Sequence, residues 1–342
     1  MRALIVGFGN LGQKVASILS REREYFPGLG DLEVIPAGII TRSRGGLIDP
    51  QGVDFDAALT MMERYGKFDA GSSFYSETGA LEATQRLEYD VLVELSTLSI
   101  ENHGEPAVSH IRAALGRGKH VVSANKGPVA FRYSELSELA REKRCRFLFE
   151  TVVMDGAPVF NLARCTLKGC TVKGIEGILN STTNFVLTKM EQGFPMEEAV
   201  KEAQRLGIAE AEPSLDLEGW DAAAKTAVLA NVLMNANITP YEVNRSGITG
   251  ITEEEITSAR RRGRHLKLVC RAKVENGTIK ASVGVEELPE NHHFSAVSGS
   301  GSILRIETDL MNPIMVTQED PNLYDTAYGV LDDLLTLHRS MA

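Results

Sequence analysis

The stretch that decides the fold is Arg2-Ala3-Leu4-Ile5-Val6-Gly7-Phe8-Gly9-Asn10-Leu11-Gly12. Residues 2–6 form an apolar run of strand length, and three glycines follow it at once. Apolar side chains then return at helical spacing, at Leu11, Val15, Ile18 and Leu19. This order predicts a strand, a tight turn and a helix.

The three glycines predict a binding site for a dinucleotide. The first permits a tight turn, the second lets the backbone approach a pyrophosphate, and the third lets the helix pack against the strand. The helix that follows offers unpaired N–H groups and a partial positive charge to the phosphates. The alternative is a glycine turn with a purely structural role. We expect the cofactor to lie against Gly7, Phe8, Gly9, Asn10, Leu11 and Gly12.

Further apolar runs recur along the first half of the chain. Strand-like runs at 32–41, 91–95, 120–123 and 146–149 are separated by helical stretches near 105–118 and 133–144. This alternation is typical of a doubly wound parallel sheet, so the first half is predicted to be a Rossmann-type α/β domain. Pro36 is unfavourable in a central strand, because proline cannot donate a hydrogen bond to the neighbouring strand.

The pattern changes from about residue 150. Runs at 168–179 and 279–285 alternate polar and apolar side chains as strands do, whereas 195–206 and 219–236 have helical spacing. A chain of 342 residues is longer than one hydrophobic core usually accommodates, which predicts two domains. We expect a dinucleotide-binding domain over 1–137, an α+β domain for substrate binding and dimerisation over 138–315, and a C-terminal segment, 316–342, that packs back on the first domain.

The net charge of −10 limits the partners. Nucleic acids and anionic membranes repel a chain of this charge, and no apolar run reaches the roughly 18 residues that span a bilayer. The apolar run at the N-terminus is too short for a signal peptide. We therefore expect a cytoplasmic protein that binds neither nucleic acid nor membrane and keeps its four cysteines reduced.

The end of the second predicted strand indicates which dinucleotide is bound. A site for NAD usually places Asp or Glu there to bind the ribose hydroxyls, whereas a 2′-phosphate requires arginine. Here the strand ends in Thr41, Arg42, Ser43 and Arg44, with no acidic residue until Asp49. These residues favour NADP, with NAD as the second choice; the alternative is that both arginines are ordinary surface charges.

A second group of polar residues lies between 210 and 225, where five carboxylates and one lysine occur within 16 residues. Asp221 and Lys225 are four positions apart on a predicted helix and therefore share one face. The rest of that helix is apolar almost all round, which indicates burial. A buried lysine with a carboxylate partner is a candidate for proton transfer; the alternative is a surface ion pair at a helix start.

Two further motifs point to a ligand. Lys126 follows the predicted strand 120–123, at the carboxyl edge where open α/β sheets bind ligands. The short polar side chains of 180–184 follow a strand-like run. They predict a helix N-cap, a cradle for a substrate carboxylate, or both.

These motifs together resemble homoserine dehydrogenases, and the resemblance extends over nearly the whole chain. The matching stretches are 118–127, 177–184 and 207–225. This family reduces aspartate 4-semialdehyde to homoserine with NAD(P)H, on the route to threonine and methionine. The resemblance thus implies an oxidoreductase of amino-acid biosynthesis, and it also implies a homodimer without the regulatory domain of longer relatives.

The resemblance assigns roles to individual residues. Lys225 matches the general acid that protonates the developing alkoxide, and Lys126 matches the lysine that holds cofactor and substrate in register. The remaining matches form three groups. They are the substrate-binding Glu210, Asp216, Asp221, Asn180, Ser181 and Thr182, the cofactor-binding Ser96, Thr97 and Ser123, and a sodium-binding loop with Glu150, Val153, Asp155 and Ala157.

Departures from the family pattern leave two alternatives. Ile208 stands where a tyrosine often occurs and Ser181 where a glycine is usual, which suits a dehydrogenase for another amino-acid aldehyde or alcohol. Residues 320–325 lack the glycines of the usual C-terminal turn. A non-catalytic NADP-binding sensor is the second alternative.

Overall fold

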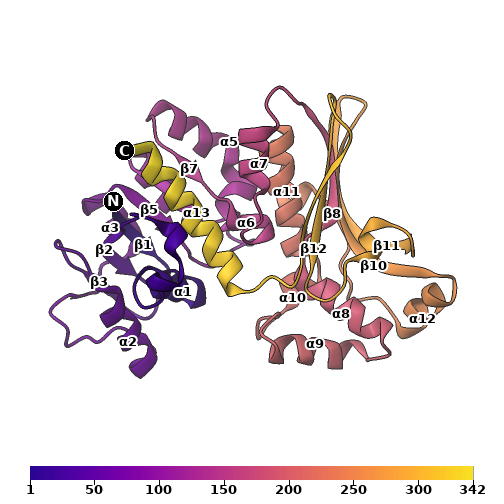
Figure 1. Ribbon diagram of the computed structural model, residues 1–342, viewed down its shortest axis with the longest axis horizontal. Helices are drawn as coiled ribbons and strands as arrows, with labels where there is room; N and C mark the ends of the chain where they lie inside the picture. The colour runs from indigo at the N-terminus through magenta and orange to yellow at the C-terminus, as the bar shows by residue number, and fades with distance from the viewer. Residues whose placement is uncertain (342) are drawn as a thin grey trace. The chain divides into compact units, whose positions relative to one another are not determined.

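The computed structural model describes residues 1–341, which form two compact units (Figure 1). Of the described residues, unit 1 comprises 1–158 together with 322–341, and unit 2 comprises 159–321. The predicted boundary between 137 and 138 is wrong, because helix α5 (Lys126–Glu142) runs through it and strand β7 (Phe147–Leu148) still pairs with the sheet of unit 1. The second boundary falls after Pro321 rather than after 315.

Unit 1 is built on a seven-stranded sheet with the order β4-β3-β2-β1-β5-β6-β7. Strands β2, β1, β5, β6 and β7 are parallel, as expected. Strands β3 and β4 form an antiparallel edge that was not predicted. The strands are β1 (Arg2–Val6), β2 (Ile35–Ile40), β3 (Gly46–Ile48), β4 (Tyr75–Ser76), β5 (Val91–Glu94), β6 (His120–Ser123) and β7. The helices are α1 (Asn10–Leu19), η1 (Arg23–Tyr25), η2 (Pro27–Leu29), α2 (Phe55–Tyr65), α3 (Ala80–Arg86), α4 (Ala107–Gly116), α5, α6 (Thr151–Met154) and α13 (Leu323–Met341).

Pro36 lies inside β2, an interior strand, at an irregularity that explains why it is tolerated. The pairing of β1 with β2 shifts by one residue between Ala3 and Leu4, directly beside Pro36. The residue left out of the ladder is Ala37, so the regular hydrogen-bond pattern is interrupted directly after the proline, as at a β-bulge.

The C-terminal helix α13 belongs to the core of unit 1. Val330, Leu334 and Leu337 are buried in the same apolar cluster as Val15 and Ile18 of α1. Burying these side chains stabilises the unit by roughly 1.5–3 kcal/mol each.

Unit 2 contains a six-stranded sheet with the order β13-β12-β8-β10-β11-β9. Helix α11 packs along one face of this sheet (Figure 1) and is buried on nearly every side through its alanines. The strands are β8 (Val172–Ile178), β9 (Asn244–Arg245), β10 (Arg264–Glu275), β11 (Thr278–Pro289), β12 (Ser302–Thr308) and β13 (Ile314–Gln318). The helices are α7 (Val159–Thr166), α8 (Ser181–Glu191), α9 (Met196–Arg205), α10 (Ser214–Leu217), α11 (Trp220–Met234), η3 (Pro240–Glu242), α12 (Glu253–Arg261) and η4 (His293–Ala296).

Within residues 1–341, no helix is both long and apolar enough to cross a membrane. The four cysteines also lie in this range, and none of them forms a disulfide.

Candidate active site

The glycine turn of unit 1 has the geometry that its sequence predicts. Gly7 has a φ of 101°, and a Cβ placed on it would lie 2.6 Å from the carbonyl of Leu95. A Cβ on Gly12 would lie 2.7 Å from the carbonyl oxygen of Gly7. Around Gly9, by contrast, there is no atom within 4 Å of the Cβ position. Gly7 and Gly12 are thus needed for packing, and Gly9 leaves space into which a phosphate fits.

The start of α1 adds an electrostatic contribution to that space. Gly9 is the N-cap residue of α1 and makes no side-chain cap, and the first turn has no acidic residue. The first amides of the helix therefore remain available to an anion. Asn10, Leu11 and Gly12 open the helix as predicted, so these residues fit a bound dinucleotide.

A cavity of about 620 Å³ adjoins the glycine turn. Its lining includes eight of the predicted cofactor residues: Gly7, Phe8, Gly9, Thr41, Arg42, Arg44, Ser96 and Thr97. Ser123 and Lys126 do not line it; Ser123 is buried at the end of β6 and Lys126 is the first residue of α5. The cavity thus gathers the residues that follow β1, β2 and β5.

The turn after β2 presents both arginines to this cavity. The Thr41 hydroxyl donates to the Gly45 carbonyl at 2.6 Å and accepts from the Arg44 N–H at 2.9 Å, which closes the turn. The side chains of Arg42 and Arg44 are exposed, and the structure of 1–341 shows no ion pair for either. Their charges are therefore available to a phosphate.

Glu77 also lines the cavity, and the sequence did not point to it. It lies far along the chain from Arg42, and the antiparallel pairing of β3 with β4 brings the two segments together. The tight fit of Tyr75 against Gly45 fixes this approach, because a Cβ on Gly45 would lie 2.5 Å from the tyrosine ring. The cavity thus contains a carboxylate as well as two guanidinium groups.

In unit 2, four predicted residues meet in one hydrogen-bonded cluster. The Asn180 amide donates to Asp216 Oδ1 at 2.7 Å and to Asp221 Oδ2 at 3.0 Å. Lys225 Nζ lies 3.3 Å from Asp221 Oδ2 and donates to the carbonyl oxygen of Leu179 at 2.7 Å. The side chains of Lys225 and Asp221 are only 15% and 13% exposed, which excludes the reading of a surface ion pair.

The polar segment 180–184 serves as a helix cap as well. Asn180 Oδ1 accepts from the Thr183 N–H at 2.8 Å and so begins α8, leaving its amide group for the two aspartates. Ser181 is the first residue of α8, and the Thr182 hydroxyl donates to the Ile208 carbonyl at 3.2 Å. One residue therefore links the start of α8 to the carboxylates.

Glu210 does not join this cluster. Its side chain is exposed, and within the described chain its only hydrogen bond is through the carbonyl, which accepts from Gln204 at 3.2 Å.

Beneath α11, Cys270 is fully buried, and burial raises the pKa of its thiol to about 11. The thiol stays protonated and does not act as a nucleophile.

The loop predicted to bind sodium uses its polar groups for protein contacts. The Asp155 carboxylate accepts from the Thr326 hydroxyl at 2.7 Å, and the N–H of Glu150 donates to Asp333 at 2.8 Å. The Ala157 N–H donates to the Met154 carbonyl at 2.8 Å. The described residues contain no group of three or more His, Cys, Asp or Glu placed to hold a metal ion. These contacts leave the carbonyl oxygens of the loop untested as cation ligands, so the sodium site stays a prediction.

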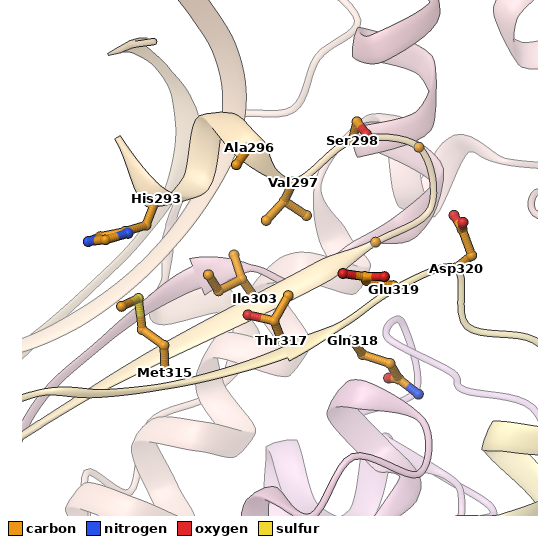
Figure 2. Close-up of a pocket in the computed structure, with 12 residues that line it drawn as sticks. His293, Ala296, Val297, Ser298, Ile303, Met315, Thr317, Gln318, Glu319 and Asp320 are labelled. Atoms are coloured by element: carbon orange, nitrogen blue, oxygen red, sulfur yellow. The ribbon is translucent and has the colours of Figure 1, made fainter. Parts of the chain in front are cut away.

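Unit 2 holds another cavity, of about 470 Å³, between η4 and the strands β12 and β13 (Figure 2). Val297, Ile303 and Met315 form its apolar part, and Glu319 and Asp320 lie at one end. None of the predicted site residues lines it, so it is separate from the lysine and carboxylate cluster.

Comparison with known proteins identifies the family. The family described as homoserine dehydrogenase matches residues 158–335, and the homoserine dehydrogenase NAD-binding domain matches residues 7–150. A homoserine dehydrogenase of Methanocaldococcus jannaschii is 36% identical over 99% of both chains. An NAD(+)-dependent homoserine dehydrogenase of Pseudomonas canavaninivorans is 35% identical over 98% of this chain and 96% of its own.

A solved structure agrees with the sequence matches. A hyperthermophilic archaeal homoserine dehydrogenase in complex with NADPH superposes with a TM-score of 0.81, at 29% identity, over 99% of this chain and 98% of its own. The sequence matches thus show that the chain is an NAD(P)-dependent oxidoreductase. The chain is a member of the homoserine dehydrogenase family.

Proposed function

We propose that the protein reduces L-aspartate 4-semialdehyde to L-homoserine with NADPH as the preferred cofactor, on the route to threonine and methionine. The observation that carries the proposal is the Lys225 ammonium, held 3.3 Å from Asp221 and 2.7 Å from the Leu179 carbonyl in a largely buried cluster. Asp216 and Asp221 suit the α-ammonium group of an amino-acid substrate by charge. The polar N-terminus of α8 suits its carboxylate.

The reaction requires one hydride and one proton. Bound NADPH supplies the hydride, which forms a new C–H bond at the aldehyde carbon while the C=O π electrons move to oxygen. Lys225 donates its Nζ proton to that oxygen and gives the alcohol. Asp221 stabilises the ammonium before transfer and orients it. Lys126, at the N-terminus of α5, is proposed to hold cofactor and substrate in register.

The preference for NADPH rests on Arg42 and Arg44. Both guanidinium groups line the cavity, and a 2′-phosphate offers them a doubly charged partner. Replacing both arginines with alanine is expected to raise the KM for NADPH at least tenfold more than the KM for NADH. Equal changes in the two constants would contradict the assignment.

The first experiment is the reduction of NADP+ by the purified protein with L-homoserine at alkaline pH, where loss of the hydroxyl proton is favoured. Homoserine-dependent reduction supports the proposal. A faster rate with another amino alcohol in a small panel would transfer the activity to that substrate, and NADPH binding without any turnover would indicate a sensor. The Lys225→Ala variant is the matched control.

A homodimer is part of the same proposal. Its support is the family resemblance, and its test is the hydrodynamic mass. A mass near 37.3 kDa, that of a single chain, would contradict it.

A further inference from the structure

A buried histidine and a buried glutamate form a pair beside the cavity that adjoins the glycine turn. Glu94 is the last residue of β5, and His110 lies on α4. His110 Nδ1 lies 2.8 Å from Glu94 Oε2, and the two side chains are 5% and 0% exposed. A fully buried carboxylate is costly unless its oxygens are bound, and both oxygens of Glu94 have a hydrogen-bond partner.

The first contact leads to the loop after β5, which lines the cavity. Glu94 Oε1 accepts from the backbone N–H of Ser96 at 2.9 Å. Ser96 and Thr97 both line the cavity, and so does His110 itself. The Glu94 carboxylate thus links the His110 imidazole to the loop that contains Ser96 and Thr97, and both the imidazole and the loop line the cavity.

The second contact leads from the loop to the start of α5. The Asn125 amide donates to the Ser96 hydroxyl and to the Thr97 carbonyl, each at 3.2 Å. Asn125 Oδ1 also accepts from the Gly127 N–H at 2.9 Å and so caps α5, whose first residue is Lys126. A continuous chain of hydrogen bonds therefore runs from His110 to the helix start that carries Lys126.

The placement of the pair argues for a function rather than for stability alone. Apolar residues of similar volume usually stabilise a core as well as a buried polar pair does, whereas a satisfied polar network fixes one arrangement of its members. The arrangement fixed here is that of the loop 95–97, against which the cofactor is expected to lie.

We propose that Glu94 and His110 are a positioning pair for the dinucleotide: the pair fixes the Ser96–Thr97 loop, and through Asn125 the start of α5, in the conformation that binds NAD(P)H. The inference rests on the proposed use of this cavity for NAD(P)H. It concerns cofactor binding and not the chemical step in unit 2.

Three substitutions at one position test which atom matters. Asparagine places its amide nitrogen where His110 has Nδ1, so His110→Asn keeps the donor to Glu94. His110→Gln places its amide further out, and His110→Leu has no donor. The Kd for NADPH, measured by its fluorescence, is expected to rise about tenfold in the Leu and Gln variants, the effect of one ordinary hydrogen bond, and to stay within about twofold in the Asn variant.

The homoserine KM separates positioning from general damage. At saturating NADP+ it is expected to rise much less than the NADPH Kd in all three variants, because the network reaches Lys126 only through Ser96 and Asn125. His120→Leu, on neighbouring β6 and outside the cavity, serves as the control for the loss of a partly buried histidine. An unchanged NADPH Kd in His110→Leu, or a rise of equal size in the Asn variant, would overturn the proposal. So would a parallel rise in the homoserine KM.

A variant at a second position, Asn125, covers the case in which His110→Leu does not fold. Asn125→Asp keeps the cap on Gly127 and loses both donations to the loop, so it is expected to raise the NADPH Kd by a similar factor. An unchanged Kd there would also count against the network. Because binding is measured without turnover, a wild-type protein that binds NADPH but does not oxidise homoserine refutes the proposed function and leaves this test intact.

Discussion

Lys225 Nζ and Asp221 Oδ2 lie 3.3 Å apart, one turn from each other on α11. The lysine is fixed from a second side by the Leu179 carbonyl, and the aspartate is fixed by the Asn180 amide. The ammonium therefore has a defined direction in a largely buried site. A proton donor must be oriented in this way before the substrate binds.

Lys225→Ala is expected to lower turnover by about 10²–10⁴-fold, the usual contribution of a general acid. The fluorescence-measured Kd for NADPH should not change, because the glycine turn that we propose to bind it belongs to unit 1. Lys225→Arg is the matched control: it keeps the charge but holds its proton too tightly to transfer it, so its rate should be as low as that of the alanine variant. A wild-type rate in either variant would remove Lys225 from this role.

Asn180 has two roles that substitutions can separate. Serine caps a helix about as well as asparagine, whereas alanine costs about 1 kcal/mol of stability. Neither side chain can donate to Asp216 and Asp221 as the amide does. Both variants should therefore raise the homoserine KM about tenfold, the effect of one or two lost hydrogen bonds, and only Asn180→Ala should also lose stability to urea. An unchanged KM in both variants would mean that Asn180 is a helix cap alone.

The glycines of the turn predict opposite outcomes for the same substitution. Gly9→Ala meets no atom within 4 Å, so the protein should fold normally, yet the new methyl occupies the space of a phosphate and should weaken NADPH binding at least tenfold. Gly12→Ala places its methyl 2.7 Å from the Gly7 carbonyl oxygen and should cost about 1–3 kcal/mol of stability. Urea unfolding and fluorescence titration distinguish the two. Normal cofactor affinity in Gly9→Ala would contradict the proposed path of the pyrophosphate.

Replacing Glu77 is expected to shift the selectivity between NADPH and NADH. Its carboxylate lines the same cavity as Arg42 and Arg44, so it can accept from ribose hydroxyls of NADH and repels a 2′-phosphate. Glu77→Gln should lower the KM for NADPH and raise the KM for NADH, changing their ratio about tenfold. Glu82, exposed on α3 and paired with Arg86, provides the control position. A constant ratio in Glu77→Gln would exclude Glu77 from cofactor selection.

Local signals in the sequence were sufficient for the glycine turn and for the Asp221 and Lys225 pair. Each depends on residues a few positions apart, where spacing decides geometry. The alternation of strands and helices was also sufficient for the parallel part of the first sheet. Comparison with the structure confirms these predictions.

The residues that the sequence missed come together through tertiary contacts. Glu77 approaches Arg42 only because two very short strands, β3 and β4, pair. Glu94 and His110 belong to a strand and a helix that share a core, and no motif marks them. Strand β10 was missed because charges interrupt its apolar run, and one of them, Lys267, is buried in the fold. Such placements depend on what covers each face, which spacing alone does not show.

Among residues 1–341, Lys267 makes hydrogen bonds only to neutral oxygens. It is 2% exposed, and its Nζ donates to Asn184 Oδ1 at 3.0 Å and to the Val297 carbonyl at 2.6 Å. Burial lowers the pKa of this lysine from 10.5 to about 8, against the opposing charge of Glu191. The folded protein therefore releases this proton more readily than the unfolded chain does.

This difference predicts how stability depends on pH. Between about pH 8 and 10.5 the unfolded chain holds the Lys267 proton while the folded protein has lost it, so this group makes the free energy of unfolding rise with pH, by at most about 1.4 kcal/mol per pH unit. Below about pH 8 both states are protonated and the slope from this group vanishes. Because other groups titrate in the same range, the quantity to measure is the stability of the wild type minus that of Lys267→Met, by urea unfolding at pH 7, 8, 9 and 10. The difference should be flat up to pH 8 and then rise.

Lys273→Met, on the same strand and partly exposed, is the control and should show no such rise relative to the wild type. A flat difference for Lys267→Met through pH 10 would show that the buried ammonium keeps an ordinary affinity for its proton.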